Sequence, residues 1–373
     1  MVKSRGPTAT PGKSPSGFGQ KNGQNGNKGG QPASPSSVEK FYAELDKCWE
    51  LLESGDLEGA KEKALHLKST DGDAPELYVL LGMVDGMMGD PEQALAHYEQ
   101  AMEIDPDYVE PIICAAELCI WELDDCERAL ELAERALDLA EEEDEYVDAL
   151  LLKAEAEMTL GEVEAAHKSL RELPDIPLSE PSYHLRAARL LLNLDHAQEA
   201  QEHFQRALHL EPENIDAVHG LGLCAGELGN KAKQVEYFQK VRAADLAEEA
   251  PPWTMPEKEF SALCSDALDE LPEAMRKLLA NVPIIATDYP SEEMVSGGQD
   301  PRILGLFAGV PHGDKPSIGG APHLDTIFLF QRNLERNSFS HEDMQEEIQI
   351  TLIHEAGHFF GLSDAQLEAM GLG

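Results

Sequence analysis

Positive charge is scarce in this sequence of 373 residues, which has 29 Lys and Arg against 71 Asp and Glu and a net charge of −42. Residues 38–254 carry 17 basic and 51 acidic side chains, and residues 255–373 carry 7 and 20. Because contacts with phosphates need clustered Lys and Arg, this acidity excludes nucleic acid as a partner of these two regions. It favours protein partners that are basic or unfolded.

Long apolar runs are absent as well. No stretch approaches the roughly 18 consecutive apolar residues of a membrane span, and no apolar run follows the N-terminal charges as in a secretory signal peptide. The six cysteines form no C-x-x-C pair, which is typical of free thiols in a reduced compartment. We therefore expect a cytoplasmic protein without a membrane partner, and no metal site built from Cys48, Cys114, Cys119, Cys126, Cys224 and Cys264.

Residues 1–37 differ from the rest of the chain in composition. They hold five basic and no acidic side chains and consist mainly of Gly, Pro, Ser, Asn and Lys. Such a segment cannot bury enough apolar surface to offset the entropy of ordering. We interpret it as a disordered basic tail, for which a solubilising or spacer role is favoured over binding to nucleic acid or membrane.

Small residues recur at a fixed period between residues 38 and 245. Their spacings are 34, 35, 37, 34 and 34 residues, and a period near 34 with paired helices is typical of tetratricopeptide repeats. Small side chains are needed where two helices touch closely, and an aromatic side chain fills the adjoining groove. The pattern predicts an all-α solenoid of six repeats. The aligned positions are Ala60, Ala94, Ala129, Ala166, Ala200 and Gln234.

The most informative motif lies near the end of the chain, where residues 354–364 read H-E-x-x-H-x-x-G-x-x-D. Positions four apart on an α-helix are about 40° apart around its axis, so His354 and His358 share one face. Glu355 lies beside that face, where a carboxylate can take a proton from a metal-bound water. H-E-x-x-H on a helix is the signature of a zinc hydrolase.

Asp364 completes this motif only if the helix stops before it. In a continuous helix it would lie about 9 Å along the axis from His358 and on the far side. Gly361 accepts a positive φ at little cost, so the helix can end there and the chain can turn back. Two histidines and a carboxylate would leave the fourth tetrahedral position of Zn²⁺ open, which is a catalytic arrangement.

Residues 255–373 resemble the small bacterial zincin-like metallopeptidases, also called minimal zincins. The resemblance is carried by a helical opening at residues 260–279, the run Ile-Leu-Gly-Leu-Phe-Ala-Gly-Val-Pro at 303–311, an apolar strand at 326–330 and the terminal motif. It implies a compact α+β zincin-like domain, zinc on His354, His358 and Asp364, and Glu355 as general base. It leaves the substrate open.

Several features near the motif allow more than one interpretation. His312, His323 and His341 precede the metal helix, and for each a surface position is favoured over a role as proton donor or replacement ligand. The strand at 326–330 offers either an edge for an extended peptide or an ordinary core strand.

We therefore expect a tail at 1–37, six repeats at 38–245, a linker at 246–254 and the zincin-like domain at 255–373. The predicted activity is hydrolysis of peptide bonds by a zinc-activated water, by an endopeptidase rather than an exopeptidase, with Glu355 as base. The solenoid would recruit the substrate. The main alternative is a tetratricopeptide adaptor whose zinc domain is catalytically idle.

Overall fold

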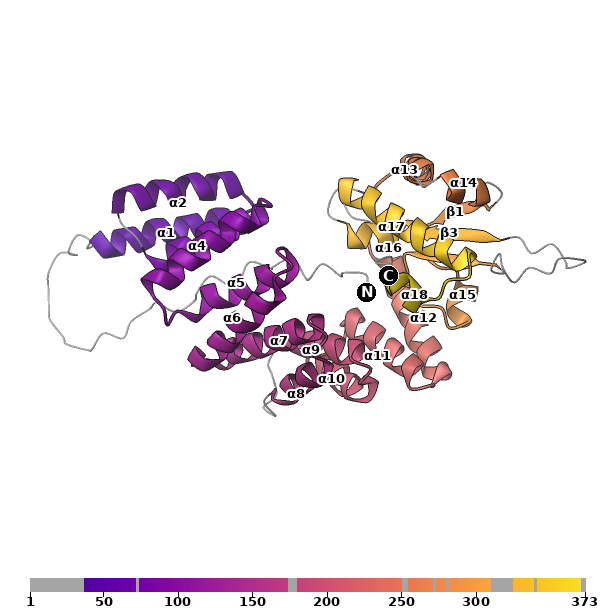
Figure 1. Ribbon diagram of the computed structural model, residues 1–373, viewed down its shortest axis with the longest axis horizontal. Coiled ribbons are helices and arrows are strands. Elements are labelled where there is room, and N and C mark those ends of the chain that lie inside the picture. Colours follow the sequence, from indigo (N-terminus) through magenta and orange to yellow (C-terminus); the bar gives the residue numbers. More distant parts are fainter. Residues whose placement is uncertain are drawn as a thin grey trace, which may run out of the picture. The chain divides into compact units, whose positions relative to one another are not determined.

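The computed structural model describes residues 37–71, 74–173, 180–249, 254–270, 273–279, 282–309, 325–338 and 341–369. The chain forms two compact units that divide between His196 and Ala197 (Figure 1). The first unit contains α1 to α9, and the second contains α10 to α18 with a small sheet.

Helices α1 to α12 follow one another as helix–turn–helix pairs. Several begin at a residue that suits a helix start, with Asp90 accepting from Gln93 N and Asn214 accepting from Ala217 N. The bounds are α1 Ser37–Glu53, α2 Leu57–Asp71, α3 Pro75–Met87, α4 Pro91–Ile104, α5 Val109–Trp121, α6 Cys126–Leu139, α7 Glu143–Thr159, α8 Val163–Arg171, α9 Pro181–Asn193, α10 Ala197–Leu210, α11 Ile215–Glu227 and α12 Lys231–Ala247.

The turn inside each pair contains one residue in the left-handed region, which glycine adopts without strain and Asp tolerates better than most. These six residues are 34, 35, 37, 34 and 34 positions apart, so they reproduce the period found in the sequence. The helical repeat fold is thereby confirmed. The turn residues are Gly55, Gly89, Asp124, Gly161, Asp195 and Gly229, with φ between 55° and 81°.

Small side chains allow the paired helices to approach closely, as predicted. A Cβ added to Gly82 of α3 would lie only 2.4 Å from the Tyr98 ring of α4. A Cβ on Gly222 of α11 would lie 2.5 Å from the Phe238 ring of α12. Each aromatic ring therefore fills the space that a glycine leaves on its partner helix.

After the repeats, the second unit contains a small α+β region. Its strand order is β1-β3-β2, with β1 parallel and β2 antiparallel to β3. Because β3 lies between two strands, it is a core strand, and the alternative that it offers a peptide edge is wrong. The bounds are α13 Glu257–Glu270, α14 Glu273–Leu279, β1 Ile284–Thr287, α15 Glu292–Ser296, β2 Gly305–Ala308, β3 Thr326–Phe330, α16 Gln331–Asn337, α17 His341–Phe359 and α18 Asp364–Ala369.

Helix α17 packs against α13 and also against strands β2 and β3 of the sheet. Ile348, Leu352 and Ala356 of α17 are fully buried and share one apolar core with Ile327 of β3 and Phe260 of α13. The apolar face of α17 thus fixes the helix on the sheet by burial. Its polar motif residues are held on a rigid element.

The last repeat helix contacts this α+β region through charged groups. Asp245 of α12 is 2% exposed and accepts from Arg302 at 3.0 and 3.1 Å and from Arg336 at 3.0 Å. Helix α12 ends at Ala247, inside the predicted linker, and residues 250–253 of that linker lie outside the described residues. The exact domain bounds stay a prediction.

Candidate metal centre

His354 and His358 lie on one face of α17, as their spacing predicts. Their Nε2 atoms are 3.0 Å apart, and the ring centroids are separated by 4.7 Å at an interplanar angle of 80°. Both side chains are partly buried. Two imidazole nitrogens that lie this close on one face of a helix could hold a metal ion together.

A hydrogen bond of Nδ1, the ring nitrogen that does not face His354, fixes the orientation of the His358 ring. Its Nδ1 lies 3.0 Å from the carbonyl oxygen of Leu362, so Nδ1–H donates to that oxygen and Nε2 keeps its lone pair. Gly361, with φ of 85°, ends α17, and Leu362 N donates back to Gly357 O at 3.0 Å. The predicted helix stop at Gly361 is confirmed. The backbone support from Leu362 was not foreseen, because it depends on where the reversed chain places a carbonyl.

Glu355 lies against the edge strand β2. The residue is 7% exposed, and its Oε2 accepts from the backbone N–H of Phe307 at 2.5 Å. Gly305 permits this approach, because a Cβ there would lie 2.9 Å from Glu355 Cγ and 2.6 Å from Thr351 Cγ2. Sequence patterns do not reveal that Phe307 N–H and Gly305 contact the predicted base, because both lie about 50 positions away from it in the chain.

Asp364 opens α18, directly after the turn that Gly361 starts. Its side chain lies outside the described part of the chain, so its role as third ligand stays a prediction. His312 and His323 also lie outside the described residues. His341 opens α17, where about 20 Å of helix axis separates it from His354, too far for both to bind one ion.

Parts of the chain match known protein families. Residues 279–373 match the family described as zincin-like metallopeptidase. Residues 75–108, 121–177 and 185–248 match tetratricopeptide repeats. The chain carries tetratricopeptide repeats and a C-terminal zincin-like metallopeptidase domain.

Solved structures resemble the repeat part in fold alone. Pseudomonas aeruginosa pilF is 15% identical with a TM-score of 0.48, over 61% of this chain and 98% of that chain. PilW, a type IV pilus biogenesis factor, is 16% identical with a TM-score of 0.48, over 60% and 99%. A tetratricopeptide repeat protein from Parabacteroides merdae is 18% identical with a TM-score of 0.44, over 64% and 96%. No curated protein matches the chain.

The residues of the zincin-like domain fit a zinc ion. Two nitrogen ligands that each lie about 2.0–2.1 Å from one tetrahedral Zn²⁺ are separated by roughly 3.3 Å, and the two Nε2 atoms come close to that separation at 3.0 Å. The hydrogen bond from His358 to Leu362 O is the outer support that metal-binding histidines usually have.

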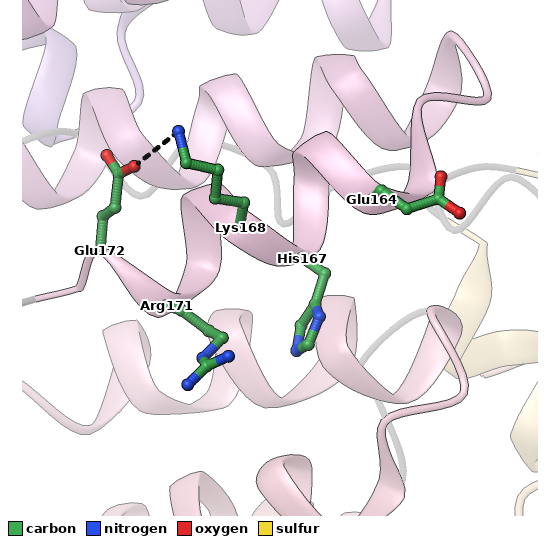
Figure 2. A pocket seen from close by; sticks show the side chains of 5 residues that line it. All are labelled: Glu164, His167, Lys168, Arg171 and Glu172. Atoms are coloured by element: carbon green, nitrogen blue, oxygen red, sulfur yellow. Dashed lines mark ion pairs between the residues drawn. The ribbon is translucent and has the colours of Figure 1, made fainter.

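A separate hollow lies on α8 of the N-terminal unit, and Figure 2 shows its charged lining. Lys168 pairs with Glu172 at 3.4 Å along the helix, and both side chains are exposed. The hollow contains none of the motif residues and plays no part in the candidate metal centre. In the described residues, no helix is long and apolar enough to cross a membrane.

Proposed function

We propose that the zincin-like domain is a zinc-dependent peptidase whose reaction takes place over α17. The observation that carries the proposal is the pair of convergent Nε2 atoms of His354 and His358, with His358 oriented by Leu362 O. These two histidines and Asp364 would hold the metal. Zinc, when bound in such a site, lowers the pKa of a water molecule and polarises a carbonyl group.

Glu355 acts as the general base in this proposal. It accepts the proton of the attacking water and later returns it to the leaving amine. Its hydrogen bond from Phe307 N–H and its close contact with Gly305 limit where the carboxylate can lie. A positioned base is more effective than a mobile one, because less orientation entropy is lost in the transition state.

The repeats would bring the substrate to this site. Stacked helical pairs provide long binding surfaces for protein segments, and the strong negative charge of residues 38–254 favours segments that are basic or unfolded. All six cysteines are free thiols, which supports a cytoplasmic location.

The proposal is tested by incubating a cell extract with the full protein or with its Glu355→Gln variant and identifying the peptides by mass spectrometry. We expect new internal cleavage sites with the unchanged protein only, because Gln cannot accept the proton. Release of single terminal residues would identify an exopeptidase instead of an endopeptidase. Identical peptide patterns from both proteins, with zinc bound to each, would favour the adaptor with an idle zinc domain.

A further inference from the structure

The chain enters strand β2 through a turn at Pro301 and Arg302, which ends shortly before the strand begins at Gly305. Strand β2 matters for the candidate metal centre, because Phe307 N–H donates to Glu355 and Gly305 leaves the room that this side chain needs. A shift of the turn would move β2 and so change where the carboxylate lies. The contacts that hold the turn therefore contribute to the placement of Glu355.

Both helices of the sixth repeat, α11 and α12, hold this turn. Arg302 Nε and Nη2 donate to the two carboxylate oxygens of Asp245 on α12 at 3.1 and 3.0 Å, and Nη1 donates to Asp216 on α11 at 2.6 Å. The Arg302 side chain is 17% exposed and that of Asp245 is 2% exposed. Asp300, beside the turn, lies 2.8 Å from His219 Nε2 of α11. Three charge-assisted hydrogen bonds from one planar guanidinium leave Arg302 little freedom to move.

The backbone around the same turn is joined to the α+β region. Asn333 of α16 is 2% exposed, and its Nδ2 donates to Pro301 O at 2.8 Å and to Ile303 O at 2.7 Å. Phe330 N, at the end of β3, donates to Leu304 O at 2.9 Å. The turn thus connects the sixth repeat, through its arginine side chain, with the sheet beside the metal helix.

We infer that Arg302 is a positioning residue for the proposed reaction: anchored by the sixth repeat, it fixes the turn before β2 and thereby the place of Glu355. The inference rests on the proposed peptidase function, and it makes the last repeat a part of the catalytic unit. Arg302 acts through Phe307 N–H and contributes no group to the reaction itself. A displaced base slows proton transfer while substrate binding is unchanged, so the effect falls on kcat and not on KM.

The test compares the full chain with its Arg302→Gln and Arg302→Lys variants, each loaded with zinc. Hydrolysis of fluorescein-labelled casein gives kcat and KM. Arg302→Gln should lower kcat by roughly tenfold and leave KM within about twofold and the zinc content unchanged. Arg302→Lys keeps the positive charge beside Asp245 but loses the planar fork, so its kcat should be intermediate. This milder variant carries the test if circular dichroism shows that Arg302→Gln does not fold.

The matched control is Arg336→Gln. Arg336 also donates to Asp245 at 3.0 Å, but it lies near the end of α16 and not before β2. The control therefore removes the same charge from the same carboxylate without loosening the turn. It should leave kcat within about twofold of the value for the unchanged protein.

Hydrogen exchange of the β2 amides, followed by mass spectrometry, tests the positioning without any hydrolysis. Exchange of the Phe307 amide should be faster by roughly tenfold in Arg302→Gln, because the strand opens more often, and unchanged in Arg336→Gln. Unchanged exchange in both Arg302 variants would overturn the inference, as would equal acceleration by Arg336→Gln or a loss of activity that lies in KM alone. Absence of hydrolysis by the unchanged protein would contradict the proposed function instead, and the exchange rates would still decide whether Arg302 fixes β2.

Discussion

At the scale of single residues, the metal centre makes a direct prediction. The purified protein should contain close to one zinc per chain, and His354→Ala or His358→Ala should lose most of it, because each removes one of two convergent nitrogens. Asp364→Ala should weaken binding clearly. Elemental analysis after dialysis against a weak chelator measures the content. Equal zinc in all three variants would contradict the assignment, and retention in Asp364→Ala alone would mean that another residue supplies the third ligand.

Glu117 gives a second prediction at this scale. Its pKa is raised by burial to about 7 in the folded protein, above the usual value near 4.3 of an unfolded chain. The folded state therefore binds the proton more tightly, so the contribution of Glu117 to stability is most favourable below pH 4.3 and is lost as the pH rises towards 7.

Replacing the Glu117 carboxyl group removes the pH dependence of its contribution to stability. From pH 5 to pH 8, Glu117→Gln should gain stability relative to the unchanged protein, by about 2 kcal/mol. Hydrogen exchange of the α5 amides measures the local opening free energy at both pH values. A difference that stays constant with pH would show that Glu117 titrates normally.

At the scale of elements, substitutions of two glycines of α3 distinguish the effect of packing on stability from the effect of helix propensity. A Cβ on Gly82 would lie 2.4 Å from Tyr98, whereas a Cβ on Gly86 meets only Ala94 Cβ at 3.8 Å. Gly82→Ala should destabilise by about 1–3 kcal/mol, because the ring must move. Gly86→Ala should stabilise by up to about 1 kcal/mol, because alanine favours the helix. Urea unfolding of both variants measures the change in the free energy of unfolding. Changes of the same sign would show that packing against Tyr98 does not control the effect of the Gly82 substitution.

At the scale of the whole molecule, the division between His196 and Ala197 gives a prediction about delivery. The fragment 197–373 keeps Asp245 with Arg302 and Arg336, and so keeps the charged contacts of α12. It should cleave a short model peptide nearly as fast as the full chain. On a natural protein substrate it should be slower, because capture by the first repeats raises the local substrate concentration.

Ionic strength provides a control for the delivery of substrate by the first repeats. The advantage of the full chain on the protein substrate should shrink from low to high ionic strength, since the charges that attract a basic segment are screened. Cleavage rates of both substrates by both proteins, at two salt concentrations, measure this. If both substrates respond alike to loss of the first unit, the repeats localise the enzyme instead of delivering its substrate.

The sequence by itself determined the features that depend on short spacings. The 34-residue period returns as one left-handed turn residue in each repeat, because small side chains and glycines set how two adjacent helices meet. The i, i+4 spacing of His354 and His358 and the helix stop at Gly361 are likewise properties of one helix and its end.

Only the tertiary structure decided the contacts between distant segments. Glu355 meets Phe307 N–H from 48 positions away, and Asp245 meets Arg302 from 57 positions away. The central place of β3 follows from pairing with strands on both sides. Such contacts form because the apolar face of α17 and the sheet bury each other, and the polar groups around that core then take the partners that the packing brings near.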